Sequence, residues 1–300
     1  MENIDKMNVA VLIPVYNEKD NLQQLIDSIK DLGLEQYHFY FIDDGSTDGS
    51  FDDIKIALDN HKIIKHRKNF GLATSVKTGI EAALLGNAEY IVKVDADLQH
   101  DLSELESLVI PLKNKNSDIV YGDRFSGSIN YKMGFIRKYG NKFFSYLMRR
   151  LTKFNIIDSQ PGFISFTREV AESIKLLGSY NYTQQILLEA AISGFTFSQV
   201  PISFNERKHG ESFISYKYPF KVFFQIFLIY SSLKPLQTFG KIGMLFITTG
   251  SMVAIYQMSR YFLDITDKLI VNDGLVSLLM LFGIQTVFVG ILGNLFKNIK

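Results

Sequence analysis

The sequence of 300 residues has no cysteine, no tryptophan, only six prolines and only five histidines. Without cysteine the chain cannot form disulfides, use a thiolate nucleophile or bind zinc through sulfur. No two histidines are four residues apart, so we do not expect a metal site built from a histidine pair on a helix. The formal net charge is only +1, which gives no general reason to expect nucleic acid as a partner.

The beginning of the chain, Met1 to Lys6, has no basic stretch followed by an apolar one, so we expect no signal peptide. With 47% hydrophobic and 21% charged residues, the chain is able to bury a sizeable core in one or two domains. The composition changes near residue 215. Charged residues are spread over everything before this point, whereas long aromatic and aliphatic runs follow it.

Two of the later runs, Ile242 to Ser259 and Gly274 to Phe296, carry no formal charge. Each is long enough to cross a bilayer as a helix. Buried core helices have a similar composition, but two such runs after an otherwise complete soluble domain favour membrane spans. The segment Val222 to Leu233 is uncharged but too short to cross, and its aromatic side chains predict a helix that lies in the membrane interface.

Lysines flank the two expected spans on their outer sides: Lys217, Lys221, Lys234, Lys241, Lys297 and Lys300. The loop between the spans, Arg260 to Asp273, carries charges of both signs. The positive-inside rule therefore predicts a multi-pass protein of the cell membrane with two spans and a cytoplasmic N-terminal domain. The expected domains are a soluble domain over 1–213, an interfacial helix region over 214–235 and a two-helix membrane domain over 236–300.

Before about residue 125 the chain alternates between buried-strand patterns and helix patterns. The expected strands are Val9 to Pro14, Phe39 to Ile42, Ile63 to Ile64, Tyr90 to Val92 and Ile119 to Tyr121. The expected helices are Glu18 to Gly33, Ser46 to Leu58, Thr74 to Leu85 and Asp101 to Leu112. This order predicts an α/β domain with a mostly parallel sheet, whose ligands bind beyond the carboxyl ends of the strands.

Polar clusters follow the first three expected strands. They are Pro14-Val15-Tyr16-Asn17-Glu18, Asp43-Asp44-Gly45-Ser46-Thr47-Asp48-Gly49 and Asn69-Phe70-Gly71. Capped turns explain part of these clusters, since asparagine, aspartate and serine are good helix caps. Two consecutive carboxylates before a glycine exceed what capping needs. An acidic strand end is able to accept hydrogen bonds from a ribose hydroxyl or a base N–H.

The stretch Asp95-Ala96-Asp97-Leu98-Gln99-His100 follows the strand at Tyr90. Its two carboxylates are two residues apart at a strand end, so they point to the same side. Such a pair suits a hard divalent cation that takes its remaining ligands from water and a diphosphate. A polar turn that caps the next helix is the alternative, and the neighbouring loops favour the metal.

Together these motifs resemble those of family 2 glycosyltransferases, which have the nucleotide-sugar-binding GT-A fold, a Rossmann-like fold. Within that family they are similar to the polyprenyl-phosphate branch, the synthases of dolichyl-phosphate mannose or glucose. The resemblance covers about residues 8 to 213 and rests on P-x-Y-N-E, D-D-G-S-x-D-G and D-A-D-L-Q-H in the family's order and spacing.

The resemblance assigns roles to these residues. Expected contacts to the nucleotide sugar are Pro14, Tyr16, Glu18, Asp43, Asp44, Asp95, Ala96, Asp97, Arg124 and Arg207. The expected ligands of Mg²⁺ or Mn²⁺ are Asp95, Asp97 and Gln99. The expected catalytic residues are Asp95, Asp97, Asp158 and Arg207, with Asp158 on the acceptor side and assigned to orientation rather than to general base.

A later segment, Arg207-Lys208-His209-Gly210-Glu211-Ser212, resembles the R-x-x-G-E-S segment that closes over the diphosphate and the lipid phosphate. By this resemblance Arg207 and Ser212 bind the acceptor phosphate. The family often has a basic residue after that serine, whereas this chain has Phe213, so the contact is missing or comes from Lys208 or Lys217. Farther back, Phe135 to Phe154 is a basic, helix-like segment, which is either a solvated face or a surface that rests on anionic headgroups.

The resemblance implies an inverting transfer of a sugar from a UDP- or GDP-linked donor to a polyprenyl or dolichyl phosphate at the cytoplasmic membrane face, with a possible homo-oligomer. Three alternatives remain. A membrane glycosyltransferase that acts on a glycan or glycolipid is the closest, but a processive polysaccharide synthase would need a Q-x-x-R-W motif, and the chain has no tryptophan. A sensor without turnover would be expected to lack the D-x-D or the distal arginine, and a nucleotidyltransferase would need a glycine-rich first loop.

Overall fold

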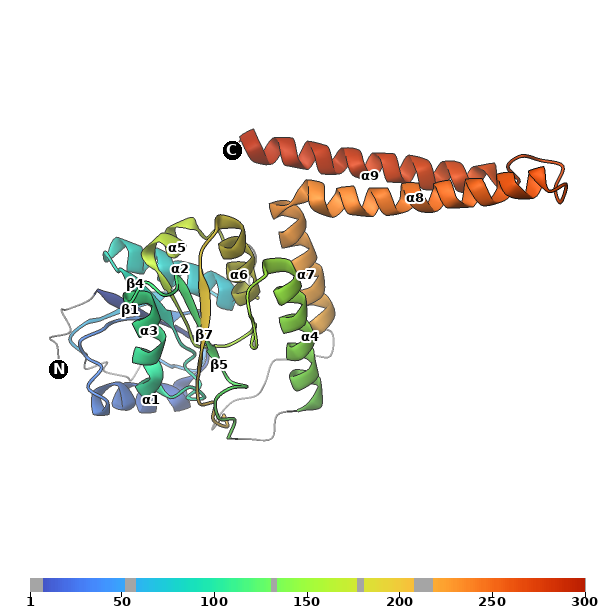
Figure 1. Ribbon diagram of the computed structural model, residues 1–300. Coiled ribbons are helices and arrows are strands. Elements are labelled where there is room, and N and C mark those ends of the chain that lie inside the picture. Colours follow the sequence, from blue (N-terminus) through green and yellow to red (C-terminus); the bar gives the residue numbers. More distant parts are fainter. Residues whose placement is uncertain (1–7, 52–57, 131–133, 177–180, 208–217, 300) are drawn as a thin grey trace. The chain divides into compact units, whose positions relative to one another are not determined.

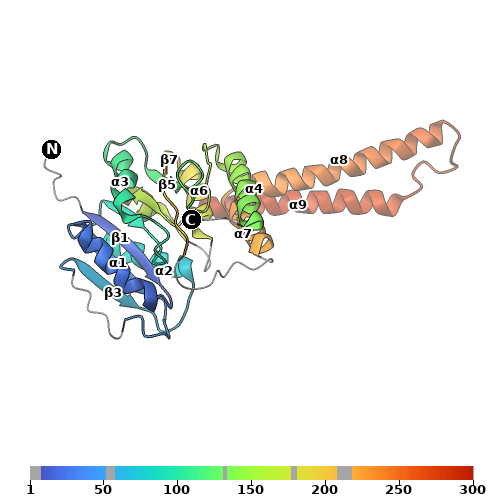
Figure 2. The same ribbon diagram turned by 90° about the horizontal axis from the view of Figure 1, so that it is seen from below.

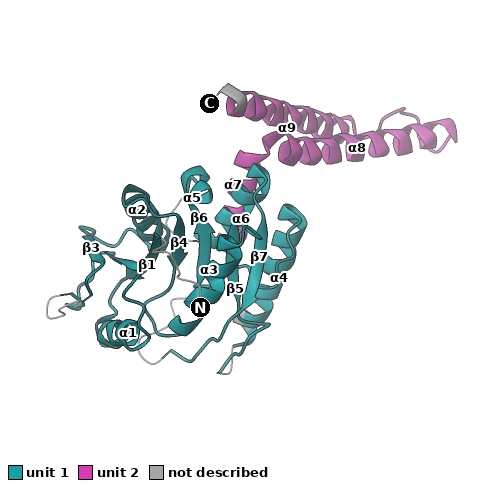
Figure 3. Cartoon of the chain, turned by 60° about the vertical axis from the view of Figure 1, so that its left-hand side comes forward, with its two compact units in different colours: residues 1–219 teal, residues 220–300 magenta. Residues whose placement is uncertain are grey.

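The computed structural model describes residues 8–51, 58–130, 134–176, 181–207 and 218–299. The chain divides into two compact units, Met1–Pro219 and Phe220–Lys300, which are coloured separately in Figure 3. The first unit is an α/β domain and the second consists of helices. Each unit is described by itself below.

The described residues of the first unit form a seven-stranded sheet in the order β3-β2-β1-β4-β6-β5-β7 (Figure 1). The strands are β1 Val9–Val15, β2 His38–Asp43, β3 His61–Lys65, β4 Tyr90–Lys93, β5 Ile119–Asp123, β6 Ile164–Thr167 and β7 Phe197–Pro201. Only β6 runs against its neighbours, β4 and β5. The other pairs are parallel, so the predicted mostly parallel sheet is confirmed.

Helices cover both faces of this sheet, as Figures 1 and 2 allow the reader to follow. They are α1 Lys19–Asp31, α2 Leu72–Leu85, α3 Leu105–Lys113, α4 Phe135–Thr152, α5 Arg168–Ser173 and α6 Tyr182–Ser193, and a short 3-10 helix, η1 Leu102–Glu104, precedes α3. Alternate residues of β1, from Val9 to Val15, share one core cluster with α1 and α3. Leu12 points the other way, toward Gly79 of α2. The period of two along β1 therefore divides its side chains between two helical layers.

The predicted helix over Ser46 to Leu58 is wrong in its first part, because Ser46 to Phe51 form bends and a turn. The carboxylate of Asp43 accepts the backbone N–H of Ser46 at 2.8 Å, and that of Asp48 accepts the N–H of Ser50 at 2.9 Å. Such local bonds to side chains replace the bonds that a helix would make. Residues 52–57 lie outside the described residues. The sequence patterns also did not predict β6, β7, α5 or α6.

The second unit contains α8 Pro235–Phe262, α9 Asp273–Ile299 and most of α7 Tyr218–Leu233. Both α8 and α9 are long and apolar enough to cross a membrane, and only 11% and 17% of their most apolar windows are buried. The two helices pack antiparallel, with backbone against backbone at Gly243 and Gly283 (Figure 1). A Cβ at Gly243 would lie 2.5 Å from the carbonyl oxygen of Gly283. The three helices fit the expected interfacial helix and two spans in length and composition.

Candidate active site

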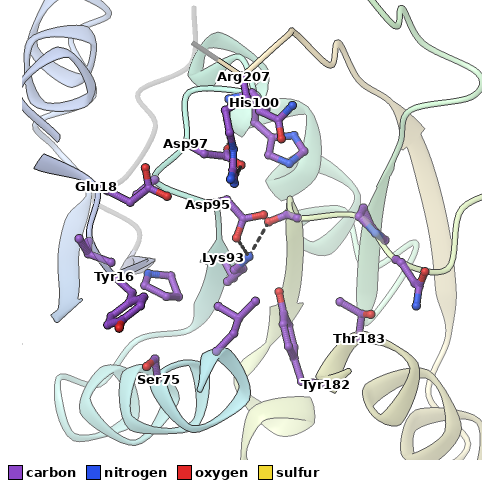
Figure 4. A pocket seen from close by; sticks show the side chains of 18 of the residues that line it. Tyr16, Glu18, Ser75, Lys93, Asp95, Asp97, His100, Tyr182, Thr183 and Arg207 are labelled. Carbon is purple, nitrogen blue, oxygen red and sulfur yellow. Dashed lines mark hydrogen bonds and ion pairs between the residues drawn. The ribbon is translucent and has the colours of Figure 1, made fainter. Parts of the chain in front are cut away.

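The carboxyl ends of β1, β2, β4 and β5 surround a cavity of about 610 Å³ (Figure 4). Most residues singled out from the motifs line it: Pro14, Tyr16, Glu18, Asp44, Asp95, Ala96, Asp97, Gln99, Arg124 and Arg207. Neither Asp43 nor Asp158 is among the lining residues. Ser212, Lys208 and Lys217 lie outside the described residues. The motifs thus meet in one place although up to 193 positions separate them in the chain, from Pro14 to Arg207.

The first two loops are tied to each other rather than merely capping their own helices. Asn17, in the left-handed region with φ of 56°, accepts the backbone N–H of Thr47 at 2.8 Å through its side-chain oxygen. Its own N–H donates to the Ser46 hydroxyl at 3.1 Å. The N–H of Lys19 donates to the carboxylate of Asp48 at 3.0 Å. These bonds hold the loop of Tyr16 and Glu18 in a fixed position beside the cavity.

The two carboxylates at the end of β2 hold loops in place. Asp44 accepts the backbone N–H groups of Phe70 and Gly71 at 3.0 and 2.8 Å, and its other close partner is Nδ1 of His66 at 2.7 Å. Asp43 accepts the N–H of Ser46. Asp44 also lines the cavity, and its hydrogen bonds to Phe70 and Gly71 show that it anchors the third loop.

A buried lysine that no motif marked, Lys93 at the end of β4, stands beneath the D-x-D stretch. Its side chain is fully buried, and Nζ donates to Oδ1 of Asp95 and, at 3.1 Å, to the carbonyl of Gly162 (Figure 4). Burial alone would lower the pKa of Lys93, but Asp95 raises it above its ordinary value. Burial would likewise raise the pKa of Asp95, yet Lys93 holds it below the ordinary value. Both groups are therefore charged, and Asp95 is fixed in orientation.

The second carboxylate of the stretch, Asp97, is held less firmly. Oδ2 of Asp97 accepts a bond from Nη2 of Arg207 at 2.6 Å, and Oδ1 accepts the backbone N–H of Gln99 at 3.2 Å. Burial and the charge of Asp95 raise the pKa of Asp97. Burial also raises the pKa of Glu18, with Asp97 and Asp95 adding to the shift. This corner of the cavity has more negative charge than its arginine compensates.

The other arginine of the cavity, Arg124, is locked in place. It binds the carboxylate of Asp158 through two nitrogens, at 2.6 and 3.0 Å, and donates to the carbonyl of Gln160 at 2.9 Å. Asn141 donates to the same carboxylate at 2.9 Å. Burial would raise the pKa of Asp158, but Arg124 and these hydrogen bonds keep it below the ordinary value. Asp158 thus reaches the cavity through Arg124 rather than with its own oxygens.

Several lining residues had no predicted role: Gln160 and Gly162, which follow Asp158, and Asn181, Tyr182 and Thr183 at the start of α6. A Cβ at Gly162 would lie 1.9 Å from Oδ2 of Asp95 and 2.6 Å from Nε2 of His100, so only glycine fits there. The ring of Tyr182 has its centre 5.5 Å from Nζ of Lys93. The sequence signal for Gln160 and Gly162 is their place within four positions of the motif residue Asp158.

His100, at the end of the D-x-D stretch, is buried between the rings of Phe163 and Phe204, with centroid distances of 5.5 and 5.0 Å. Burial lowers its pKa to about 3, so the ring is uncharged near neutral pH. Neither ring nitrogen has a hydrogen-bond partner among the described residues. His100 therefore contributes a neutral polar group to the cavity.

Comparison with known proteins defines the class. The family model of glycosyl transferase family 2 matches residues 10–175, more than half of the chain, and the chain belongs to this family. A dolichol-phosphate mannosyltransferase of Pyrococcus furiosus is 32% identical over 69% of this chain and 59% of that protein. A dodecaprenyl-phosphate galacturonate synthase of Rhizobium johnstonii is 22% identical over 97% of this chain and 88% of that protein.

Among solved structures, glucosyl-3-phosphoglycerate synthase from Mycobacterium tuberculosis, in complex with Mn²⁺, UDP and glucosyl-3-phosphoglycerate, aligns with a TM-score of 0.57. It is 18% identical, and the alignment covers 76% of this chain and 80% of that one. At this identity the likeness concerns the fold. The expected family and its GT-A fold are confirmed, and the named relatives fall in the branch that the motifs indicated.

Proposed function

We propose that this chain transfers one sugar from a nucleoside diphosphate sugar, linked to UDP or GDP, to a polyprenyl phosphate. The observation that carries the proposal is the meeting of Glu18, both D-x-D carboxylates and Arg207 in one cavity at the carboxyl edge of the sheet. Relatives named after dolichol phosphate and dodecaprenyl phosphate support the acceptor class. The cavity size is within the range of small-ligand sites.

A divalent cation fits the corner around Asp97. The described residues contain no group of three or more histidine and carboxylate side chains able to hold a metal by themselves. Asp97 with the free oxygen of the Gln99 amide therefore supplies a partial set of ligands, and Asp95 lies beside it with one oxygen on Lys93. Such a set suits Mg²⁺ or Mn²⁺, which would add positive charge against the leaving diphosphate. The raised pKa of Asp97 fits a site that lacks positive charge.

The acceptor requires no protein base. A phosphate monoester has a second pKa of about 6 and presents an oxyanion at neutral pH. In the proposed reaction this oxygen forms a bond to the anomeric carbon while the bond from that carbon to the diphosphate oxygen breaks, so one displacement inverts the centre. The chain's own residues hold the two anions in line and screen their repulsion. We assign to Arg207 the screening of this repulsion and to Ser212 the binding of the acceptor phosphate. Asp158 is assigned to holding Arg124 in place.

The remainder of the chain suits a membrane-bound acceptor. We infer that α8 and α9 span the membrane and that α7 lies in its interface. On α4 the exposed aromatic residues Phe135, Tyr139, Phe143 and Tyr146 alternate with basic ones, which suits contact with anionic headgroups. The flanking lysines favour a cytoplasmic first unit.

The test of the proposed function is transfer to lipid. Membranes that contain the protein are incubated with radiolabelled UDP- and GDP-sugars and then extracted with organic solvent. We expect labelled lipid that mild acid releases as free sugar, and no label when the polyprenyl phosphate is removed by prior phosphatase treatment. Equal labelling with a neutral prenol as the acceptor would overturn the proposal.

Topology is tested separately. A reporter fused after Lys300 is expected on the cytoplasmic side, and one inserted between Arg260 and Asp273 on the opposite side. A chain that ends after Leu233 should still associate with vesicles that contain anionic lipids through α7. If that shortened chain is fully water-soluble without detergent, the interfacial assignment of α7 fails while the two spans stand.

A further inference from the structure

The cavity contains polar atoms that lack a hydrogen-bond partner within the described part of the chain. They are both amide atoms of Asn181, Nε2 of Gln160, both ring nitrogens of His100 and the hydroxyl of Ser75. Buried polar groups without partners cost stability, and natural proteins keep few of them. Four such side chains around one cavity indicate that a ligand supplies their partners.

Asn181 gives the strongest indication. It stands in the left-handed region with φ of 60°, directly before α6, and is only 8% exposed. An asparagine at this position usually caps its helix, but here the side chain makes no capping bond. Its amide instead lines the cavity together with the first residues of α6, Tyr182 and Thr183. Asn181 is thus able to both donate to and accept from a bound molecule.

The cations that line the cavity, in contrast, already have anionic partners among the described residues. Lys93 pairs with Asp95, Arg124 with Asp158, and Arg207 with Asp97. Glu18, Asp44 and Glu206 add further carboxylates to the lining. The buried atoms without a partner among the described residues therefore belong to amides, a hydroxyl and an imidazole, whereas the lysine and the arginines of the described lining already pair with carboxylates.

We propose that the transferred sugar is an uncharged hexose or N-acetylhexosamine, whose hydroxyl or acetamido groups bind Asn181 and Gln160, and that the cavity rejects uronic acids. This inference rests on the proposed function, because it concerns the donor of that reaction. Hydroxyl and amide groups satisfy the unpaired atoms by donating and accepting hydrogen bonds. A carboxylate would lose its hydration without gaining a cation, and it would lie near the charge of Asp95. On this reading the chain differs from its galacturonate-transferring relative in donor choice.

The direct test compares donors that differ only in the charge of the sugar. The matched pairs are UDP-glucose with UDP-glucuronate, UDP-galactose with UDP-galacturonate, and GDP-mannose with GDP-mannuronate, with UDP-N-acetylglucosamine added. Two quantities are measured for each donor with Mn²⁺ and the full-length protein. One is its affinity, from competition with a labelled nucleoside diphosphate, and the other is the rate of sugar transfer to lipid. We expect the best neutral donor to exceed its anionic partner at least about 100-fold in kcat/KM. An equal or better uronate overturns the inference and leaves the proposed function intact.

The two proposals also fail in distinguishable ways. If neutral donors bind more tightly than uronates but no sugar reaches the lipid phosphate, the donor inference stands and the proposed acceptor is wrong. If no nucleoside diphosphate sugar competes at all, both are wrong.

A pair of variants tests the proposed role of Asn181 in donor binding. Asn181→Gly removes the amide while glycine tolerates the positive φ. Asn87→Gly is the matched control, because Asn87 has φ of 58° and is exposed outside the cavity. We expect Asn181→Gly to lower kcat/KM for the preferred donor about 10- to 100-fold and to leave the affinity for the nucleoside diphosphate unchanged. Gln160→Leu should act in the same direction. Full activity of both cavity variants would contradict the assignment.

Discussion

Two arginine–aspartate pairs face the same cavity and differ in almost every physical respect. Arg124 and Asp158 have side chains only 6% and 0% exposed and are joined by two hydrogen bonds. Arg207 and Asp97 are 27% and 7% exposed, and Nη2 of Arg207 donates to Oδ2 of Asp97 at 2.6 Å. Asn141 and the backbone of Gln160 add bonds to the first pair. The first is a closed network in the interior, whereas the second is partly exposed and both its partners line the cavity.

The difference in burial and hydrogen bonding between the two pairs indicates a structural role for Arg124–Asp158 and a role in the reaction for Arg207–Asp97. A buried pair in which every oxygen is bonded holds its geometry, and removing one partner leaves an uncompensated charge inside the protein. The more exposed Arg207–Asp97 pair lines the cavity itself, within reach of a bound molecule. We therefore expect substitutions in the Arg207–Asp97 pair to affect turnover, and substitutions in the Arg124–Asp158 pair to affect stability as well.

The largest effect is expected from Asp97→Asn, with a loss of turnover of about 1,000-fold or more, because the main ligand of the proposed cation disappears. The fold should persist, since burial and Asp95 already disfavour the charge on Asp97. Transfer assays and thermal melting measure the two effects. Asp101→Asn is the control, because Asp101 is exposed and caps η1 outside the cavity. Near-normal turnover of Asp97→Asn would exclude the proposed metal role.

Removal of divalent cations should reproduce this loss in the unaltered protein. Excess EDTA is expected to abolish transfer, and added Mg²⁺ or Mn²⁺ to restore it. The leaving diphosphate is an anion, and the lysine and arginines of the described lining already pair with carboxylates. The measurement is transfer before and after the metal is restored. In Asp97→Asn the residual rate should change little with EDTA. Full activity of the unaltered protein in EDTA would remove the metal from the mechanism.

A loss of about 100-fold in kcat/KM, with a raised KM for lipid phosphate, is expected for Arg207→Ala. The melting temperature should change by no more than a few degrees, because the ion pair is partly exposed. Arg168→Ala provides the control, since Arg168 forms a partly exposed pair with Glu172 away from the cavity. An unchanged KM for the acceptor would assign Arg207 to the donor alone.

The smallest loss of turnover, about 10-fold, is expected for Asp158→Asn, together with the largest loss of stability, about 3 kcal/mol. The folded pKa of Asp158 is below its ordinary value, so the carboxylate stabilises the fold above pH ~4 and this contribution fades as the pH falls through the folded pKa. The stability gap to Asp158→Asn should therefore narrow in acid. If the pH–rate profile loses an ionisation unlike that of phosphate, Asp158 acts as a base.

The sequence predicted the first half of the sheet well because its signals are local. Strands β1, β2 and β4 contain apolar runs, and α1 and α2 end at Asp31 and Leu85, close to the expected Gly33 and Leu85. The antiparallel β6 was not predicted, because polar residues interrupt its sequence Ile164-Ser165-Phe166-Thr167, and its place comes from pairing with β4 and β5. The same reasoning explains the missing β7.

The candidate site likewise contains residues that the sequence predicted and contacts that only the structure reveals. The D-x-D carboxylates and Glu18 stand in motifs whose strand ends meet in any parallel sheet, so their gathering was predictable. Lys93 was missed although its partner Asp95 is only two positions away, and its contact with the carbonyl of Gly162 spans 69 positions. Asp158 was recognised by resemblance, but only the structure reveals that it acts on Arg124. Distance in sequence hid the contacts of Lys93 with Gly162 and of Arg124 with Asp158.

The backbone contact between α8 and α9 determines at which positions of this helical pair the residue type is able to vary in evolution. A Cβ at Gly243 or Gly283 would lie within 3 Å of the opposite helix, so neither position has room for a larger residue. Met252, Ile255 and Leu281 are exposed, and any bulky apolar side chain would serve there. Across close relatives, the residues at positions 243 and 283 should therefore both remain small. The exposed positions should remain apolar, but the particular side chain should vary.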